Sequence, residues 1–385
     1  MPLYDIIFYV NARVFIPFFI FLGVPKLRHK TYKILKPILT SLICIVSSLA
    51  ILVSGYIAIV WGNIPYITDL RDLYIETAMT TFTHQWLATS FFPAWLVEDV
   101  MDKQERPDLI EIPLPSPTDE NASPAPTPTP IPDILGQEFL TVGEKDKNGN
   151  KVLVNDVEEG IVIVQVSGST FEGKLVLIDD PSRVFLGVTD RKGVWGQTIN
   201  KMMKRYNAVV GINASGFEDP DGHGKGGVVN GRCYSEGESW GIYNATYSSI
   251  CFNKDNKLIV GDYYEWDKHN IRDGIQFTPV IISNGKVVLG RGYGLQPRTV
   301  IAQADNGVVM FLVIDGRALH SVGATYKDCA NILLKYNAVS AAACDGGSSS
   351  VLWYKNSIQN VPSTPMKDTG RYLPNAFMVR SKSAE

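Results

Sequence analysis

The chain has 385 residues, a net charge of −3 and five cysteines, and 45% of its residues are hydrophobic. This length is enough for one large globular domain with attached segments. The C-terminal half has no basic run, so it lacks the charge pattern of a nucleic-acid-binding protein, and we expect no nucleic-acid partner. Five cysteines at irregular spacings do not form a disulfide framework, and a Cys233–Cys251 pair stays open.

An apolar segment near the N-terminus predicts a membrane anchor. Ile38 to Trp61 is an uncharged run of 24 residues, longer than the roughly 20 that a helix needs to cross a bilayer. Five Lys and Arg residues lie between 26 and 36, and the next is Arg71. This asymmetry predicts a transmembrane helix at 38–61, with 1–37 cytoplasmic or interfacial and the rest of the chain extracytoplasmic. A cleaved signal peptide is the alternative, and a second membrane segment within 1–30 stays open.

Two segments separate this helix from the rest of the chain. Residues 62–106 carry apolar side chains at helical spacing and predict a helical stalk. Residues 107–134 are rich in proline, Ser and Thr, a composition that favours an extended, semi-rigid spacer. The remaining residues, 135–385, are predicted to form the globular domain.

The pattern of this domain predicts an α+β fold, a mixed sheet with flanking helices. Short β-branched runs at 160–166, 173–178 and 183–188 indicate strands, and Asn284-Gly285 between two apolar runs indicates a hairpin. Helices are expected at 197–206 and 325–336. The second helix begins with Thr325 and Asp328 at capping-box spacing, with Ala330, Leu333 and Leu334 on one face.

The stretch Tyr336 to Tyr354, YNAVSAAACDGGSSSVLWY, predicts a strand, a tight polar turn and a second strand. Asp345 ends the first apolar run, and Gly346, Gly347, Ser348 and Ser349 follow it. Their N–H and hydroxyl groups can converge on an anionic oxygen beside the carboxylate. The alternative is a glycine-rich hairpin that only turns the chain.

A similar order of elements occurs upstream. Tyr-Asn-Ala-Val at 206–209 repeats at 336–339, and each copy follows a predicted helix and precedes an apolar strand and a polar loop. We expect both units in one sheet, so that the loops beginning at Asn213 and Asp345 leave the same strand edge, where α/β sheets bind ligands.

A second hairpin brings charged residues together. Runs at 300–304 and 308–314 flank Asp305-Asn306-Gly307, and a two-residue turn places Arg298 opposite Asp315, with Arg317 just beyond. Two separated carboxylates suit glycoside chemistry, and arginines suit phosphate binding. The alternative is an ordinary cross-strand ion pair.

The loop 216–227 contains Glu218, Asp219, Asp221 and His223. We favour a lid or wall of the site over a metal site, since the loop is not an EF-hand and has no zinc spacing. We assign no metal ligands and no certain cofactor. Whether a divalent cation assists the reaction stays open. Ser348 lacks the G-x-S-x-G context of a serine hydrolase.

Several ordered motifs between about 160 and 380 resemble the phosphodiester glycosidase family. These motifs are DPSR at 180–183, GINASGF at 211–217, PRTVIAQ at 297–303, VIDGR at 313–317, CDGGSSS at 344–350 and LPNAFMV at 373–379. The resemblance implies hydrolysis of glycosyl phosphodiesters. The family usually has glycine where this chain has Ala214, Ser215 and Ser348.

The sequence therefore predicts a cell-membrane hydrolase whose extracytoplasmic C-terminal domain cleaves sugar-1-phosphodiester links in a phosphate-containing carbohydrate, such as exopolysaccharide or cell-wall polysaccharide. Asp345, Asp315 and Glu218 are the candidate catalytic residues. The candidate substrate-binding residues are Asn213, Arg298, Arg317, Gly346, Gly347, Ser348 and Ser349. A non-catalytic polysaccharide-binding module and a glycosyl or phosphoglycosyl transferase are the alternatives.

Overall fold

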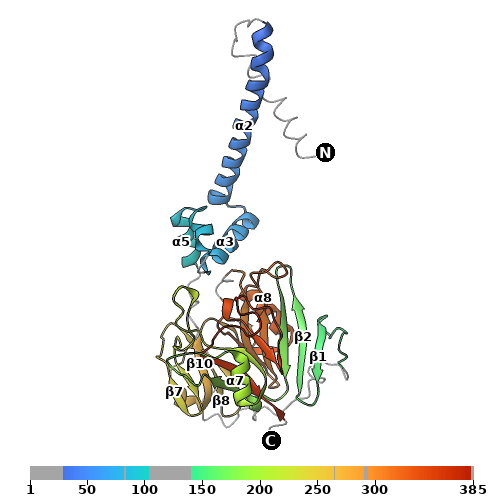
Figure 1. Cartoon of the computed structure of the whole chain (residues 1–385), viewed down its shortest axis with the longest axis vertical. Coiled ribbons are helices and arrows are strands. Elements are labelled where there is room, and N and C mark those ends of the chain that lie inside the picture. Colours follow the sequence, from blue (N-terminus) through green and yellow to red (C-terminus); the bar gives the residue numbers. More distant parts are fainter. Residues whose placement is uncertain (1–28, 82–83, 104–139, 264, 290–293, 383–385) are drawn as a thin grey trace. The chain divides into compact units, whose positions relative to one another are not determined.

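The computed structural model describes residues 29–81, 84–103, 140–263, 265–289 and 294–382. It divides into two compact units, Met1–Asp72 and Leu73–Glu385. In the first unit, helix α2 (His29–Trp61) contains an apolar stretch, Pro37–Trp61, that is long and apolar enough to cross a membrane (Figure 1). Membrane anchoring itself stays a prediction.

Within the described residues of the predicted stalk region, three helices follow α2. These are α3 (Pro65–Met79), α4 (Gln85–Thr89) and α5 (Ala94–Asp102). The boundary between the two compact units falls inside α3, so the end of this helix groups with the rest of the chain. The predicted proline-rich spacer lies outside the described residues, and a separate stalk stays a prediction.

The largest element is an eight-stranded sheet in which every pairing is antiparallel, so the prediction of flanking helices holds but the prediction of a mixed sheet is wrong. Its strands, in spatial order, are β1 (Lys151–Asp156), β2 (Ile161–Ser167), β3 (Glu172–Ile178), β14 (Val309–Ile314), β13 (Arg298–Ala304), β15 (Ala338–Ala343), β11 (Val280–Ser283) and β12 (Lys286–Val287). The predicted two-residue turn at Asn284-Gly285 is confirmed, because Ser283 pairs with Lys286 and both turn residues have positive φ.

Two five-stranded sheets accompany it, also with antiparallel pairings throughout. One has the order β17 (Ser357–Ile358), β16 (Leu352–Tyr354), β5 (Ala208–Asn213), β18 (Asn375–Arg380) and β4 (Val184–Val188). The other has the order β7 (Glu238–Trp240), β6 (Cys233–Ser235), β10 (Ile271–Phe277), β8 (Ser248–Asn253) and β9 (Leu258–Gly261).

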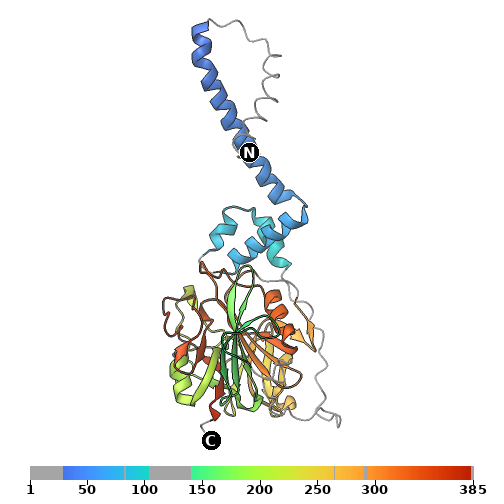
Figure 2. The same ribbon diagram turned by 90° about the vertical axis from the view of Figure 1, so that its right-hand side faces the viewer.

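The large sheet is covered on both faces. Alternate residues of its strands pack on helix α8 (Tyr326–Lys335), and the residues between them pack on the two smaller sheets. Helix α7 (Ile199–Tyr206) covers the outer face of the β5 sheet, so α7 and α8 lie on opposite flanks of the domain (Figure 2). This double cover explains why β14, VMFLVI, is buried at every position.

Helix α8 begins at the predicted capping box. Thr325 Oγ1 accepts a hydrogen bond from Asp328 N, and Asp328 Oδ2 accepts one from Thr325 N. Ala330 and Leu333 are buried as predicted, but Leu334 is exposed. The buried face of α8 is formed by Tyr326, Cys329, Ala330 and Leu333, and Leu334, about 100° around the helix from Leu333, lies at its edge.

The predicted register of the β13–β14 hairpin is wrong by one residue. Arg298 pairs with Ile314, not with Asp315. Ala304 N donates to Val308 O, which leaves Asp305, Asn306 and Gly307 as a three-residue turn instead of a two-residue one. Arg298 and Asp315 therefore do not lie directly opposite each other, although both remain at the open end of the hairpin.

The two repeated units also differ from the prediction, because β5 and β15 lie in different sheets. Their loops nevertheless meet. Asp345 N donates to Ala214 O over 2.8 Å, and the Asn213 side chain donates to Asp345 O over 2.5 Å. The oxygen of the same side chain accepts bonds from Thr299 Oγ1 and Val351 N. Asn213 thus connects the two sheets at the point where the segments after β5 and β15 leave them.

The cysteines of the domain are separate thiols. Cys233 and Cys251 are both buried and free, although both lie opposite β10. Cys233 contacts the Ser215 hydroxyl and the Asn375 amide. Burial raises the pKa of Cys233 to about 12, so this thiol stays protonated at neutral pH.

We predict that Asn213→Ala destabilises the domain by about 2–4 kcal/mol. The substitution removes three hydrogen bonds and leaves Val351 N and the Thr299 hydroxyl buried without this partner. Urea unfolding would measure the loss. Asn356→Ala, at an exposed position, is the control and should change stability by less than about 0.5 kcal/mol. Equal effects of the two substitutions would contradict a linking role for Asn213.

Candidate active site

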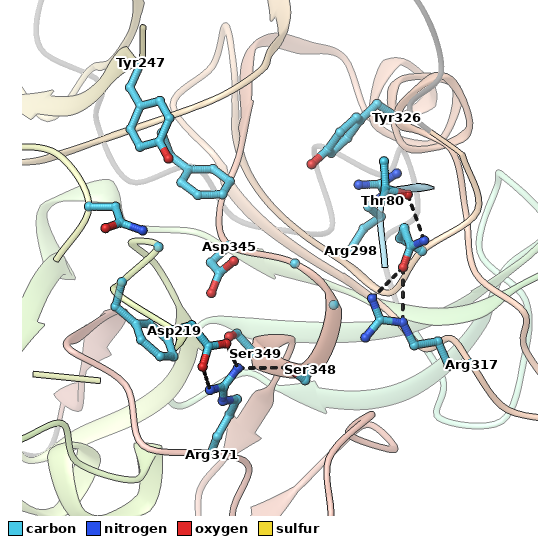
Figure 3. A pocket seen from close by; sticks show the side chains of 17 residues that line it. Thr80, Asp219, Tyr247, Arg298, Arg317, Tyr326, Asp345, Ser348, Ser349 and Arg371 are labelled. Carbon is cyan, nitrogen blue, oxygen red and sulfur yellow. Dashed lines mark hydrogen bonds and ion pairs between the residues drawn. The ribbon is translucent and has the colours of Figure 1, made fainter. Parts of the chain in front are cut away.

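A pocket of about 320 Å³ opens where these loops meet (Figure 3). The loop after β5, the start of β13, helix α8 and the loop after β15 each contribute to it. Its lining residues are Thr80, Gly216, Phe217, Asp219, Asn230, Tyr247, Phe277, Gln296, Arg298, Arg317, Tyr326, Asp345, Gly346, Gly347, Ser348, Ser349 and Arg371. The pocket therefore combines carboxylates, guanidinium groups and aromatic rings.

The Asp345 loop passes from one sheet to another, so it is not a simple hairpin. Asp345 lies two residues after the end of β15 in the large sheet, and the chain then enters β16 in the sheet of β5. Gly347 has φ +59°, a left-handed conformation that favours glycine, and its N–H donates to Pro297 O. A Cβ atom at Gly346 would lie 2.9 Å from the same carbonyl oxygen. Both glycines thus allow the loop to lie against the start of β13.

Asp345 lies between the two groups of arginines in this pocket (Figure 3). Its carboxyl group faces the cavity and is otherwise surrounded by protein. This burial raises its pKa to about 6, against the opposing effects of a Ser349 hydrogen bond and the Arg371 charge; the nearby Asp219 charge adds to the increase. A carboxyl group with this pKa can exchange a proton near neutral pH, as a catalytic acid or base must.

On one side of Asp345, Arg371 forms an ion pair with Asp219. Arg371 Nη1 lies 2.6 Å from Asp219 Oδ2, and its Nη2 lies 2.7 Å from Oδ1. Arg371 Nη1 also donates to the Ser348 hydroxyl over 2.9 Å. Burial alone would raise the pKa of Asp219, but the Arg371 hydrogen bonds and charge outweigh it and lower that pKa. Asp219 is therefore the ionised carboxylate of the pocket, and Asp345 is the one that can titrate.

On the other side, two arginines lie close together. Arg298 is buried, donates to the carbonyl oxygens of Ala324 and Gly294, and lies over the ring of Tyr326. Arg317 is more exposed and donates twice to Gln296 Oε1. The pKa of Arg317 is lowered by desolvation first and by the charge of Arg298 second, while Asp345 opposes both. Repulsion between the two cations favours an anion between them.

The structure brings most of the predicted site residues into this one pocket. Those that line it are Arg298, Arg317, Asp345, Gly346, Gly347, Ser348 and Ser349. Asn213 is fully buried and instead positions the Asp345 loop.

Two predicted catalytic carboxylates are not among the lining residues. Asp315 is buried, and its Oδ1 accepts a hydrogen bond from Val361 N while Oδ2 lies 3.4 Å from His320. Glu218 is exposed to solvent. Asp315 and Glu218 therefore have no catalytic role in the proposed mechanism.

Sequence reasoning gave no catalytic or binding role to nine polar or aromatic residues of the pocket: Thr80, Phe217, Asp219, Asn230, Tyr247, Phe277, Gln296, Tyr326 and Arg371. Asp219 directly follows Glu218, and no local pattern distinguishes the half-buried residue from its exposed neighbour. Arg371 stands two residues before the LPNAFMV motif, with no local pattern that marks it. Its role is apparent only from its contacts with Asp219 and Ser348.

No group of three or more His, Cys, Asp and Glu side chains in the described ranges is arranged to hold a metal ion. The charged groups of the pocket are instead paired with one another or with neutral hydrogen-bonding partners. The arrangement can bind an anion beside a titratable carboxylate.

Comparisons with known proteins identify this part of the chain. Residues 206–380 match the family model described as phosphodiester glycosidase. This segment is a phosphodiester glycosidase domain. The segment contains Asp219, Arg298, Arg317, Asp345 and Arg371, so all the charged residues that line the pocket lie within the family domain.

One relative is the uncharacterized protein YomE of the SPbeta prophage of Bacillus subtilis. It is 28% identical over 186 residues, which cover 44% of this chain and 27% of that protein. The chain thus spans about a quarter of the length of this relative.

Two solved structures are also similar. The zebrafish N-acetylglucosamine-1-phosphodiester alpha-N-acetylglucosaminidase catalytic domain, auto-inhibited by its pro-peptide, has a TM-score of 0.49 at 18% identity, covering 63% of this chain and 87% of that one. A hypothetical protein from Synechocystis has a TM-score of 0.49 at 16% identity, covering 60% of this chain and 64% of that one.

We predict that Asp345→Asn makes the phosphodiester glycosidase domain more stable at pH 8 than the wild type, by about 2–3 kcal/mol. Because the pKa of Asp345 is raised on folding, its titration contributes stability that is fully present below about pH 4 and is lost as the pH rises to about 6. The variant lacks this loss. Thermal unfolding between pH 4 and 8 measures the difference, and a gap that narrows towards high pH would contradict the assignment.

Proposed function

We propose that the chain is a membrane-anchored, extracytoplasmic hydrolase that cleaves sugar-1-phosphodiester links. The family domain supports a hydrolase of phosphodiester–sugar linkages. The observation that carries the finer proposal is a single pocket in which a carboxyl group with a pKa of about 6 lies next to two adjacent arginines. Such a pocket provides both an anion-binding side and a proton-transfer group.

The phosphodiester group binds at Arg298 and Arg317 in this proposal. Guanidinium groups bind phosphate oxygens through charge-assisted, often bidentate hydrogen bonds. Arg317 makes no ion pair within the described part of the chain, since its side chain donates to the neutral amide of Gln296. Its full charge therefore stays available for a substrate, unlike that of Arg371, which Asp219 neutralises.

The sugar ring occupies the other half of the pocket, next to Asp345. Phe217, Tyr247 and Phe277 line this half, and the rings of Tyr247 and Phe277 are 5.7 Å apart. Aromatic walls with a few placed polar groups are typical of small-molecule sites. Asn230 and Asp219 supply polar groups that can bind sugar hydroxyls.

Asp345 acts in its ionised form. As positive charge develops on the anomeric carbon, the bond between that carbon and the phosphate oxygen breaks, and the phosphate monoester leaves with the bonding electrons. Water then adds to the anomeric carbon and gives one proton to Asp345. A phosphate monoester is a good leaving group that the arginines also stabilise, so protonation of the leaving oxygen contributes little.

The location of the reaction follows from the N-terminal part of the chain. The apolar stretch Pro37–Trp61 supports a membrane anchor, and the basic residues before it support an extracytoplasmic domain. Polysaccharide of the cell surface, such as exopolysaccharide or wall polymer, is then the substrate class that the enzyme would meet.

Hydrolysis in ¹⁸O-labelled water tests the reaction. With methyl diesters of hexose 1-phosphates as substrates, the label is expected on the sugar product, since the carbon–oxygen bond breaks. Label on the phosphate would contradict the mechanism. Asp345→Asn should lower kcat by about 10²–10⁴-fold. The control Asp305→Asn, at an exposed turn, should keep wild-type turnover.

The same assays address the two alternatives. If the wild type and Asp345→Asn both bind the substrate and neither turns it over, the domain is a binding module. Capture of the sugar by an added alcohol would favour a transferase.

The dependence of kcat/KM on pH tests the role of Asp345 separately. Because the ionised form is active and its pKa is about 6, kcat/KM should rise about tenfold per pH unit below pH 6 and level off above it. Asp345→Asn should lose this rise. A wild-type profile that falls as the pH increases through 6 would instead assign Asp345 as a general acid.

A further inference from the structure

The side chain of Gln296 connects two parts of the chain that are far apart in sequence. Its Nε2 donates to Thr77 O over 3.1 Å and to Thr80 Oγ1 over 3.0 Å. Its Oε1 accepts two hydrogen bonds from Arg317, at 3.1 Å from Nε and 2.7 Å from Nη2 (Figure 3). The amide thus uses both of its ends, one towards the C-terminal end of α3 and one towards the arginine.

Two backbone contacts strengthen this connection. Gly294 N donates to Glu76 Oε2 over 3.1 Å, and Leu295 N donates to Thr77 Oγ1 over 3.0 Å. Glu76 is only 5% exposed and Gln296 only 4%. Residues 76–80 and 294–296 belong to the same compact unit, Leu73–Glu385, and Thr80 lines the pocket itself.

The Thr80 hydroxyl is oriented to accept the hydrogen bond from Gln296. Thr80 Oγ1 donates its own proton to Glu76 O over 2.7 Å, in the last turn of the helix. Its lone pairs therefore face the Gln296 amide nitrogen. With Nε2 held by two oxygen acceptors, Oε1 must point to Arg317, because the amide cannot be turned without placing oxygen against oxygen.

A neutral amide suits this position better than a carboxylate would. Arg298 repels Arg317, so the Arg317 side chain needs a partner to keep it in the pocket. A carboxylate would hold the guanidinium but would also cancel its charge. Gln296 holds it by hydrogen bonds and leaves the positive charge available to an anion.

We propose that Thr80 and Gln296 are positioning residues that orient the Arg317 guanidinium towards the phosphate of the substrate. The end of α3, which lies outside the family domain at 206–380, thereby completes the pocket. This proposal rests on the proposed function. It also implies that residues 135–385 alone form an incomplete site.

The test uses the full chain and two measurements: the Kd of inorganic phosphate by calorimetry, and kcat and KM on a sugar phosphodiester. Thr80→Val removes the hydroxyl at nearly constant volume, and Gln296→Met removes the amide. Thr80→Val is expected to raise both the phosphate Kd and KM by about 3-fold, and Gln296→Met by about 10-fold. Both variants should change kcat less. Gln296→Glu should weaken phosphate binding further, because its carboxylate neutralises Arg317.

Matched variants separate positioning from general loss of structure. Thr80→Ser keeps the hydroxyl and should bind phosphate as the wild type does. Thr89→Val removes an exposed helical threonine hydroxyl that bonds only within α4 and should change neither constant. Adding Thr80→Val to Gln296→Met should cause no further loss, because the two residues act on Arg317 in series.

The outcomes distinguish the two proposals. If Arg317→Met weakens phosphate binding while Thr80→Val and Gln296→Met do not, the positioning role is wrong and the proposed function stands. If Arg317→Met leaves the phosphate Kd unchanged, the anion site of the proposed function is wrong. If Thr80→Val tightens phosphate binding or raises kcat, the end of α3 covers the pocket instead of completing it, which also overturns the inference.

Discussion

The hydrogen bonds of one buried side chain, Asn213, hold the pocket together. It ends a strand of one sheet, donates to the backbone of Asp345 at the end of another, and accepts bonds from Thr299 and Val351. Because the sheets are packed face to face through a common core, their strand ends have little freedom to separate. The position of the Asp345 carboxylate thus depends on the packing of two sheets rather than on the conformation of its own loop.

The pocket at this junction of two sheets has two sides that differ in charge. On one side the positive charge is neutralised, and on the other side it is available to a ligand. Asp219 neutralises Arg371, whereas Arg317 is held by the neutral Gln296. Asp345 lies between them and is raised in pKa chiefly by burial. This separation is what a glycosyl phosphodiester needs, since its anionic group and its reacting carbon require different surroundings.

Local features of the sequence predicted local structure well. The Asn284-Gly285 turn and the Thr325 capping box are confirmed because each depends on only a few neighbouring residues. The predicted register of β13 and β14 is wrong because Asp305-Asn306-Gly307 forms a three-residue turn, and one extra turn residue shifts every pairing. The prediction that the two similar helix–strand units share one sheet is wrong, because the strands that pair with β5 and β15 are distant in sequence and local patterns do not indicate them.

The sequence by itself determined the kinds of group that the site would use: a carboxylate at a strand end, adjacent glycines and serines, and arginines at the open end of a hairpin. Only the tertiary structure decided which carboxylate accompanies Asp345. Asp219 and Glu218 are neighbours with the same chemistry, and burial against Arg371 distinguishes them. That choice depends on contacts between residues about 150 positions apart, and such contacts leave no trace in local spacing.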